Sequence, residues 1–155
     1  MNATPRWLDP EQKAAWDHFI RMQEKLVGRL SRHLQSDSKL SAADYVVLAA
    51  LTESEGGRMR FLNLTRRVEW EKSRMSHQVG RMAKRGLVTR EECPEDGRGA
   101  FVVATPEGYR AIEEAAPLHV EHVRRLFIDA LTQEELDTLG RLSARVLAHM
   151  EQQPD

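Results

Sequence analysis

Residues 70–88 read WEKSRMSHQVGRMAKRGLV, and this stretch decides the fold of the chain. Its apolar residues are Met75, Val79 and Met82, and their spacing of three and four predicts an amphipathic helix. Gly86 marks the end of that helix. The other face holds arginine, glutamine, histidine and serine, which pair with base edges in a DNA major groove. An isolated solvated helix has the same pattern, so the neighbouring segments decide between the two interpretations.

The segment before this helix predicts its partner. Residues 61–68 form a short amphipathic pattern in which Phe61, Leu64 and Val68 face inward. Residues 69–71 then make a tight turn. Two helices joined in this way, the second of them basic, are typical of a helix-turn-helix that places its second helix in the major groove.

A β-hairpin is predicted directly after the basic helix. Residues 87–91 and 100–104 have the composition of strands, and residues 93–97 (CPEDG) have that of a turn. A hairpin in this position is a wing. Arg98 lies next to its tip.

Two helices are predicted before this winged segment. A capping box at Asp9 begins the first, which should run to about Leu34 and be followed by a polar break over residues 35–39. Ser41 caps the second helix, with Asp44 as the acid three residues on. The apolar run 45–51 predicts that this helix is buried on nearly all sides.

Two more helices are predicted after the wing. Thr105 begins the first of them, and Pro117 lies inside its pattern, where we expect a kink or a broken turn. A capping box at Thr132 begins the last helix, which should end near Met150. Neither end of the chain has a complete core of its own, so its helices are expected to pack against a second copy.

The predicted fold class is mainly α, an α+β winged helix-turn-helix with about six helices and a small β-wing. Residues 41–104 are expected to form the winged helix-turn-helix DNA-binding region. Residues 1–40 and 105–155 are expected to form a helical dimerisation region from the N- and C-terminal helices. A two-fold dimer would place two recognition helices about one turn of DNA apart.

The charges of the chain are unevenly distributed. The net charge of the 155 residues is −1, yet residues 58–90 hold ten lysines and arginines against two acidic residues. Residues 105–155 hold five basic residues against ten acidic ones. A basic middle between acidic flanks is the pattern expected when one segment faces phosphates, although a solvated surface can also carry such charge.

Several classes of protein are not expected from this sequence. Cys93 is the single cysteine, which leaves no disulfide framework and no Cys-rich metal site. No secretory signal is visible, and the longest apolar run is too short to cross a membrane, so a cytoplasmic protein is expected. There is no nucleophile elbow, phosphate-binding glycine loop or apolar pair of carboxylates, so neither an enzyme nor a cofactor is expected.

The chain resembles the MarR family of transcriptional regulators from about residue 9 to residue 150. The resemblance is carried jointly by residues 72–76 (KSRMS), 86–90 (GLVTR), 96–98 (DGR) and 105–108 (TPEG). It implies a winged-helix homodimer that binds a palindromic operator in double-stranded DNA, usually as a repressor released by a small ligand or an oxidant. Glu71 departs from the family pattern, which often has Ser or Thr there, and Ala104 replaces a more usual Leu.

The same resemblance implies which residues contact DNA. The positions that match the recognition helix are Ser73, Arg74, Ser76, His77, Gln78 and Arg81. Lys72 is a further candidate beside them, as a phosphate contact. Arg98 matches the wing arginine that enters the minor groove, and Asp96 matches the acid that orients this arginine.

A ligand pocket is expected at Trp16, His18, Phe19 and Tyr45. Ligands of the family, often aromatic acids, bind between the dimer helices and the winged domain. An aromatic stripe at helical spacing is also typical of a core, so both interpretations stay open.

The sequence disfavours two further roles, oxidant sensing and metal binding. Cys93 is flanked by acidic residues, which disfavour the thiolate that a redox sensor needs. His119 and His122 lie three apart on a predicted helix and could share a metal with His18, His33 or His149. Exposed helix histidines are commoner than such ligand sets, so no metal site is expected.

The expected function is that of a dimeric, sequence-specific DNA-binding transcriptional regulator, a repressor released by a small ligand. One alternative is a winged-helix module that binds a protein partner. A transcriptional activator of the same fold is the other.

Overall fold

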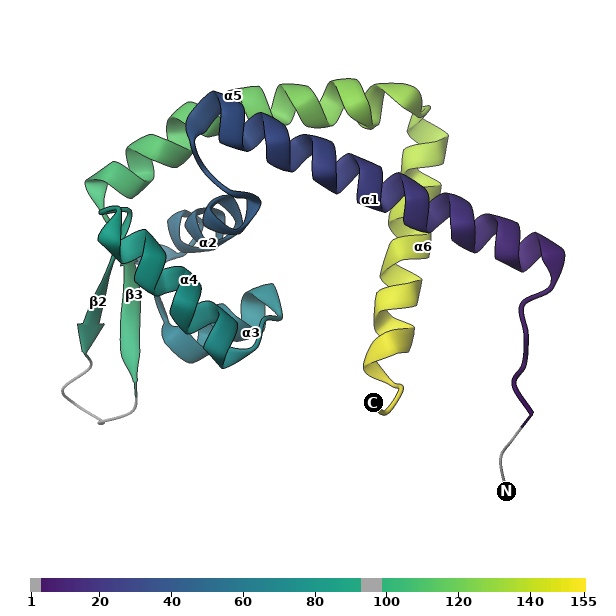
Figure 1. Ribbon diagram of the computed structural model, residues 1–155, viewed down its shortest axis with the longest axis horizontal. Coiled ribbons are helices and arrows are strands. Elements are labelled where there is room, and N and C mark those ends of the chain that lie inside the picture. The colour runs from purple at the N-terminus through teal and green to yellow at the C-terminus, as the bar shows by residue number, and fades with distance from the viewer. Residues whose placement is uncertain (1–3, 93–98) are drawn as a thin grey trace. The chain divides into compact units, whose positions relative to one another are not determined.

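The computed structural model describes residues 4–92 and 99–155, and the structural statements that follow concern these residues. They form six α-helices and a three-stranded antiparallel sheet, which confirms the predicted winged-helix class and the number of helices (Figure 1). The chain divides into two compact units, Met1–His119 and Val120–Asp155, and each is described by itself.

The helices and strands follow the predicted order along the chain. The helices are α1 (Pro10–Ser38), α2 (Ala42–Thr52), α3 (Phe61–Val68), α4 (Lys72–Lys84), α5 (Pro106–Leu126) and α6 (Gln133–Glu151). The strands are β1 (Arg58–Arg60), β2 (Val88–Glu92) and β3 (Ala100–Ala104). One-turn 3-10 helices lie at Glu55–Gly57 and Ile128–Ala130.

Reciprocal capping boxes begin three of the helices where the sequence predicts them. The Asp9 carboxylate accepts a hydrogen bond from the Gln12 N–H at 2.8 Å, and the Gln12 side chain accepts one from the Asp9 N–H at 3.0 Å. The same reciprocal bonds begin α2 and α6, in the pairs Ser41–Asp44 and Thr132–Glu135. These bonds satisfy N–H groups that a helix start leaves without intrahelical partners.

The first helix is longer than predicted. It continues to Ser38 and is capped by Lys39, whose φ of 59° is left-handed. The Ser38 hydroxyl donates a hydrogen bond to the Leu34 carbonyl at 2.7 Å. The polar break expected over residues 35–39 is therefore wrong, because serine can bond back to the preceding turn while the backbone stays helical.

The core of the first unit is built around α2, which confirms its predicted burial. Val47, Leu48 and Leu51 have no exposed surface. Fully buried side chains from the winged segment join them, namely Leu64, Met75, Val79, Met82 and Val102. These residues come from α3, α4 and β3, so the core fixes the recognition helix against α2.

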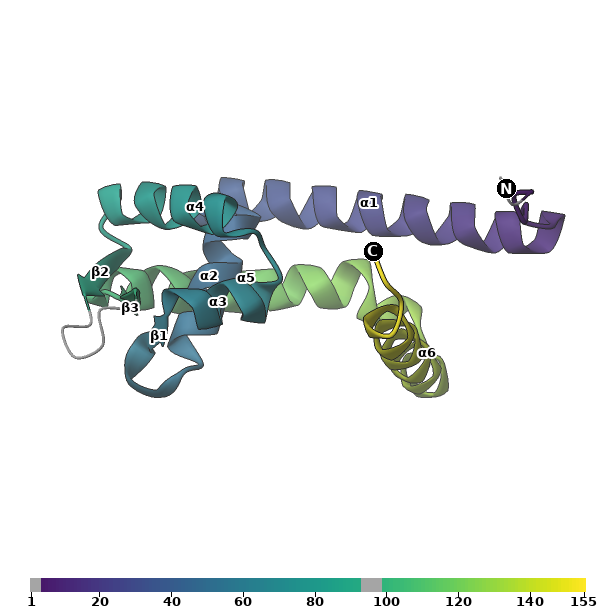
Figure 2. The same cartoon turned by 90° about the horizontal axis from the view of Figure 1, so that it is seen from below.

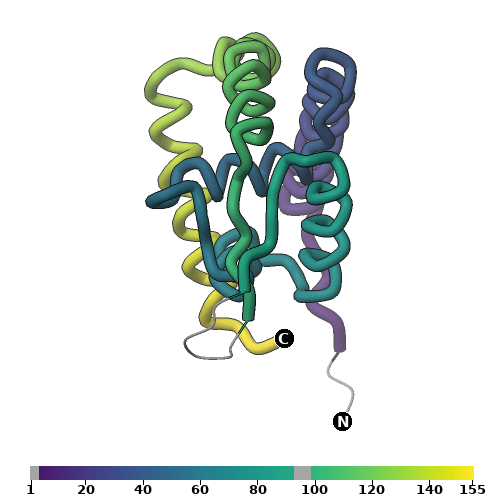
Figure 3. Tube along the Cα trace, turned by 90° about the vertical axis from the view of Figure 1, so that its left-hand side faces the viewer, coloured from purple at the N-terminus to yellow at the C-terminus, as the bar shows by residue number. Residues whose placement is uncertain are grey.

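The wing contains one more paired strand than the predicted hairpin. The sheet has the order β1-β3-β2, with Arg58 opposite Val103 and Val88 opposite Ala104. Figure 3 shows β2 and β3 running side by side. Figure 2 shows β1 leading into α3, so this strand ties the helix-turn-helix to the wing.

The helix after the wing begins at the predicted cap. The Thr105 hydroxyl accepts a hydrogen bond from the Gly108 N–H at 3.0 Å and donates one to the Gly86 carbonyl at 2.6 Å. Pro117 lies inside α5, and the helix continues to Leu126. The helix is therefore continuous through Pro117 and the expected broken turn does not occur, while a kink there stays a prediction.

The second unit holds the end of α5, the Ile128–Ala130 turn and α6. The Thr132 backbone N–H donates to the Glu135 carboxylate at 3.0 Å, and this bond lowers the pKa of Glu135 below its usual value. Across the described residues, no helix combines the length and the apolar character that crossing a membrane requires.

Candidate nucleic-acid interface

The recognition helix α4 packs on the core with one face and presents the other to solvent. Met75, Val79 and Met82 are fully buried. The exposed residues include Lys72, Ser73, Arg74, Ser76, His77 and Arg81. All of these were predicted to face DNA, and they lie together because their helical spacing places them opposite the three apolar anchors.

The turn between α3 and α4 is short and internally bonded. Glu69 follows α3 with a left-handed φ of 56°, and the Trp70 N–H donates to the Thr65 carbonyl at 3.1 Å. Glu71 is the N-cap of α4, but its side chain makes no capping hydrogen bond. The start of the recognition helix is therefore held by the turn and by core packing.

Trp70 supports one of the predicted DNA contacts. Its side chain packs partly against the core, and the Arg74 guanidinium carbon lies 4.0 Å from the centre of its ring. A guanidinium over an indole face is a favourable cation–π arrangement. The ring thereby holds Arg74 in a defined position on the exposed side of α4.

The wing adds a cation beside the recognition helix. Arg90 on β2 donates a hydrogen bond to the Ser76 hydroxyl at 3.3 Å and lies over the Phe61 ring at 5.4 Å. A hollow of about 410 Å³ opens here and is lined by Phe61, Lys72, Ser73, Ser76, Arg90 and Ala100. Its two charged side chains are both basic, which favours an anionic occupant.

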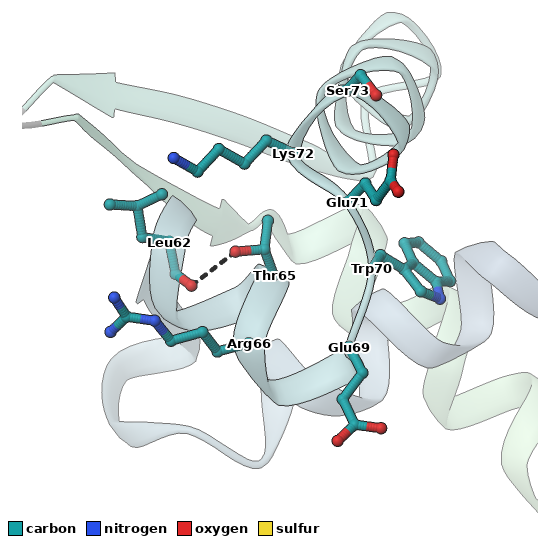
Figure 4. A pocket seen from close by; sticks show the side chains of 8 residues that line it. All are labelled: Leu62, Thr65, Arg66, Glu69, Trp70, Glu71, Lys72 and Ser73. Carbon is teal, nitrogen blue, oxygen red and sulfur yellow. Dashed lines mark hydrogen bonds between the residues drawn. The ribbon is translucent and has the colours of Figure 1, made fainter. Parts of the chain in front are cut away.

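A second hollow lies where α3 meets the start of α4 (Figure 4). Its volume is about 640 Å³, and its lining comes from Leu62, Thr65, Arg66, Glu69, Trp70, Glu71, Lys72 and Ser73. In Figure 4 the charged groups of Arg66 and Lys72 point to one side, whereas the carboxylates of Glu69 and Glu71 lie on the other. The hollow is thus polarised, with its cations separated from its acids.

Gln78 does not lie on the exposed face of α4, where the sequence predicts it. Its side chain is only 4% exposed, and its Nε2 donates a hydrogen bond to Asp44 Oδ1 at 2.6 Å. Its Oε1 accepts a hydrogen bond from the Arg81 guanidinium at 2.8 Å. The expectation that Gln78 lies on the exposed polar face of α4 is therefore wrong, because its amide is buried and bonded at both ends within the protein. A DNA contact by Gln78 stays a prediction.

Two of the predicted DNA contacts, Asp96 and Arg98, lie outside the described residues, as does Cys93. The roles implied for the wing tip therefore stay predictions. Among the described residues, the pairing of β2 and β3 extends to Glu92 opposite Ala100.

The residues predicted to line a ligand pocket lie in two different settings. Trp16 and Phe19 are about half exposed on α1, with ring centroids 6.2 Å apart, and His18 between them is also exposed. The Tyr45 ring instead lies tilted by 43° against the His119 ring, with the two ring centroids 4.5 Å apart. Burial raises the pKa of the Tyr45 phenol above its usual 10.0, and the Glu53 carboxylate raises it further. The ligand pocket stays a prediction.

Sequence reasoning missed the residues that orient the recognition helix from its buried side. Asp44 was predicted only as a helix cap, yet its buried carboxylate also bonds Gln78 and Arg85. An acid in the first turn of an apolar helix gives no sign of such long-range contacts, which join positions 34 and 41 residues apart. Trp70 gave a partial signal, since a large aromatic side chain in a tight turn needs a partner.

Comparisons with known proteins agree with this geometry. A model of the MarR family matches residues 38–99, from the end of α1 to the residue before β3. AbsC, a MarR family transcriptional regulator from Streptomyces coelicolor, is 39% identical, and the match covers 96% of this chain and 100% of AbsC with a TM-score of 0.91. The chain belongs to the MarR family.

Two further relatives of this MarR-family protein are informative. Sco3205, a MarR family transcriptional regulator from S. coelicolor whose crystal structure is a complex with DNA, is 38% identical. That match covers 98% of this chain and 94% of Sco3205, with a TM-score of 0.91. The transcriptional regulator HosA of Escherichia coli O111:H- is 29% identical over 108 residues, which are 70% of this chain and 78% of HosA.

Family membership defines the general role of the protein. It is a DNA-binding transcriptional regulator with a winged helix-turn-helix, and the expectation that it is not an enzyme is confirmed by the family. Family membership does not define the operator sequence, the ligand or the individual residues that contact DNA.

Proposed function

We propose that this MarR-family regulator binds a palindromic operator as a homodimer and represses transcription until a small aromatic ligand releases it. The observation that carries the proposal is the two-sided character of α4. Its apolar anchors Met75, Val79 and Met82 are fully buried, while its arginines, serines and histidine face solvent. A helix fixed in this way can enter a major groove without losing its place in the core.

The exposed face supplies two kinds of contact. Lys72 and Arg66 carry positive charges on one side of the hollow at the α3–α4 turn, where they suit DNA phosphates. Arg74 and Arg81 are held by Trp70 and Gln78, so they are the better candidates for reading base edges. The proposed readout therefore uses the two supported arginines, and Gln78 acts behind them.

Exposed apolar side chains support a homodimer. On α1, Trp16, Phe19 and Val27 are half exposed, and a large exposed apolar patch is typical of an interaction surface. On α6, the same holds for Leu142, Val146, Leu147 and Met150. Covering these residues with a second copy would give a two-fold dimer with two recognition helices, which suits a palindromic operator.

The proposed ligand switch acts on the geometry of the dimer. A ligand at Trp16, His18, Phe19 and Tyr45 would favour one spacing of the two recognition helices over another. Only a difference in affinity for the two dimer shapes can release the operator. A reporter gene under the selected operator tests the direction of control: loss of the regulator should raise transcription, and a fall would indicate an activator.

Selection of binding sites from random DNA tests the proposal directly. The expected product is a palindrome whose half-sites lie about one helical turn, roughly 34–36 Å, apart. Affinity for it should fall steeply with salt, because phosphate contacts release counterions. No enriched palindrome, or an affinity that does not change with salt, would contradict the proposal and favour a module that binds a protein partner.

A matched pair of arginine variants assigns the interface. Arg81→Ala should weaken operator binding by about 1–3 kcal/mol. Arg145→Ala removes an arginine that is also exposed, from α6, and should leave operator affinity unchanged. Equal effects of the two substitutions would show that general positive charge, and not the recognition helix, determines binding.

A further inference from the structure

A buried carboxylate lies directly beneath the recognition helix. Asp44 is 4% exposed, and its two oxygens are bonded by different residues of the α4 segment. Oδ1 accepts a hydrogen bond from Gln78 at 2.6 Å, and Oδ2 accepts one from Arg85 at 2.6 Å. Oδ2 also accepts the Ser41 backbone N–H at 2.9 Å, as part of the α2 cap. One side chain thus joins the start of α2 to the helix proposed to enter DNA.

Arg85 extends this brace to the end of α1. Its second guanidinium nitrogen donates a hydrogen bond to the Lys39 carbonyl at 2.7 Å, while the first pairs with Asp44. Arg85 is the C-cap residue of α4, and Lys39 is the left-handed cap of α1. The brace therefore fixes the distal end of the recognition helix to the junction of two other helices.

The orientation of the Gln78 amide follows from this arrangement. An ionised carboxylate can only accept hydrogen bonds, so the Gln78 NH₂ group must point to Asp44. The amide oxygen is then turned outward, where it accepts the Arg81 guanidinium at 2.8 Å. Arg81 itself is exposed, and its guanidinium donates this hydrogen bond to an otherwise buried amide oxygen.

We propose that Asp44 and Gln78 are positioning residues for DNA binding, because they set the direction in which Arg81 leaves α4. This inference rests on the proposed DNA contact of Arg81. A free arginine loses side-chain freedom when it binds, and an arginine already held in place loses less. The hydrogen bonds from Gln78 to Asp44 and from Arg81 to Gln78 thus fix the Arg81 guanidinium, on the surface proposed to bind DNA, relative to the buried core.

A double-mutant cycle on the full-length protein tests the inference. Gln78→Met keeps the length of the side chain but removes both hydrogen bonds. With Arg81 present, it should weaken binding to the selected operator about fivefold to twentyfold, the range expected for losing an arginine–amide bond. In an Arg81→Ala background, the same substitution should change affinity by less than about twofold.

The cycle has a matched control and a clear contrary outcome. Combined with Arg90→Ala, whose contact is to Ser76, Gln78→Met should show its full effect. If Gln78→Met weakens binding by the same factor with and without Arg81, Gln78 does not act through Arg81 and the inference is wrong. If the unmodified protein selects no DNA, the proposed function itself fails, which is a different result.

Variants of α2 separate positioning from simple stability. Asp44→Ala removes both acceptor oxygens, including the one that Gln78 donates to, and should weaken operator binding only when Arg81 is present. Ser41→Ala removes a capping bond at the same helix start but leaves the Gln78 contact in place. It should lower the melting temperature and leave operator affinity unchanged. Equal losses of affinity in both variants would show that Asp44 matters only for folding.

Discussion

The guanidinium group of Arg74 lies 4.0 Å above the ring of Trp70, four residues earlier in the chain. This contact crosses the start of the recognition helix, from the helix-turn-helix turn to the exposed face of α4. It places a cation on an aromatic support at the surface proposed to bind DNA. Sequence patterns give Trp70 no role in the turn, whereas in the structure its ring supports the Arg74 guanidinium.

Replacing Trp70 should weaken DNA binding through Arg74. Trp70→Leu removes the aromatic face, and an exposed cation–π contact contributes about 0.5–1 kcal/mol. Operator affinity, measured by fluorescence anisotropy, should therefore fall roughly twofold to fivefold. Trp70→Phe keeps an aromatic face and should lose less. If both variants bind like the unmodified protein, the stack does not serve DNA binding.

Two glycines in helices should respond in opposite ways to alanine. A Cβ at Gly108 would lie 2.2 Å from the Leu87 carbonyl oxygen and 3.2 Å from Leu48 Cδ2. Gly108→Ala must therefore move the backbone and should lower the free energy of unfolding by about 1–3 kcal/mol. At Gly140 no atom of the described residues lies within 4 Å of such a Cβ. Gly140→Ala should stabilise the protein by up to about 1 kcal/mol, because alanine favours the helix.

Chemical denaturation of both variants checks this prediction. The close approach of α5 to the end of the α4–β2 connection is what makes Gly108 necessary, since Leu87 also receives the Thr105 N–H at its carbonyl oxygen. A Gly108→Ala variant as stable as the unmodified protein would mean that this approach relaxes without cost.

Glu71 is expected to limit both the stability of α4 and its affinity for DNA. It is an N-cap without a side-chain bond, and Asp is a far better residue at that position. Glu71→Asp should stabilise the protein by about 1 kcal/mol with little change in DNA binding, because the charge is kept. Glu71→Gln should instead raise operator affinity by up to about fivefold, because a negative charge near phosphates is removed.

Melting curves and salt-dependent binding assays separate the two effects of Glu71. The gain in affinity of Glu71→Gln should shrink as salt rises, since screening weakens the repulsion that was removed. A gain that is the same at low and high salt would point to a cause other than charge.

The Tyr45 phenol should ionise only at strongly alkaline pH. Burial raises its pKa above 10.0 in the folded protein, with a further contribution from Glu53. Its contribution to stability is therefore complete below the unfolded pKa of about 10 and is lost as pH rises through the folded value. The chain has two tyrosines, so in a Tyr109→Phe variant the absorbance of tyrosinate near 295 nm reports Tyr45 alone. A midpoint at or below 10 would contradict the burial that Tyr45 has in the structure.

Local patterns were sufficient to predict much of this protein. The capping boxes at Asp9, Ser41 and Thr132 each depend on side chains within three residues of the cap, so their signal lies in the sequence itself. The apolar spacing of α4 likewise fixed which face is buried. The end of α1 was misplaced because serine suits both a loop and a final helical turn.

The sequence by itself determined the order of the elements, the buried stripe of the recognition helix and the resemblance to the MarR family, because these depend on residues close together in the chain. Only the tertiary structure decided that Gln78 is buried, that Asp44 bonds both Gln78 and Arg85, and that Arg81 is held from below. Those contacts join α2 to α4 across more than 30 residues. Their partners are chosen by how the helices pack, and helical periodicity alone cannot tell a buried amide from an exposed one at the edge of a polar face.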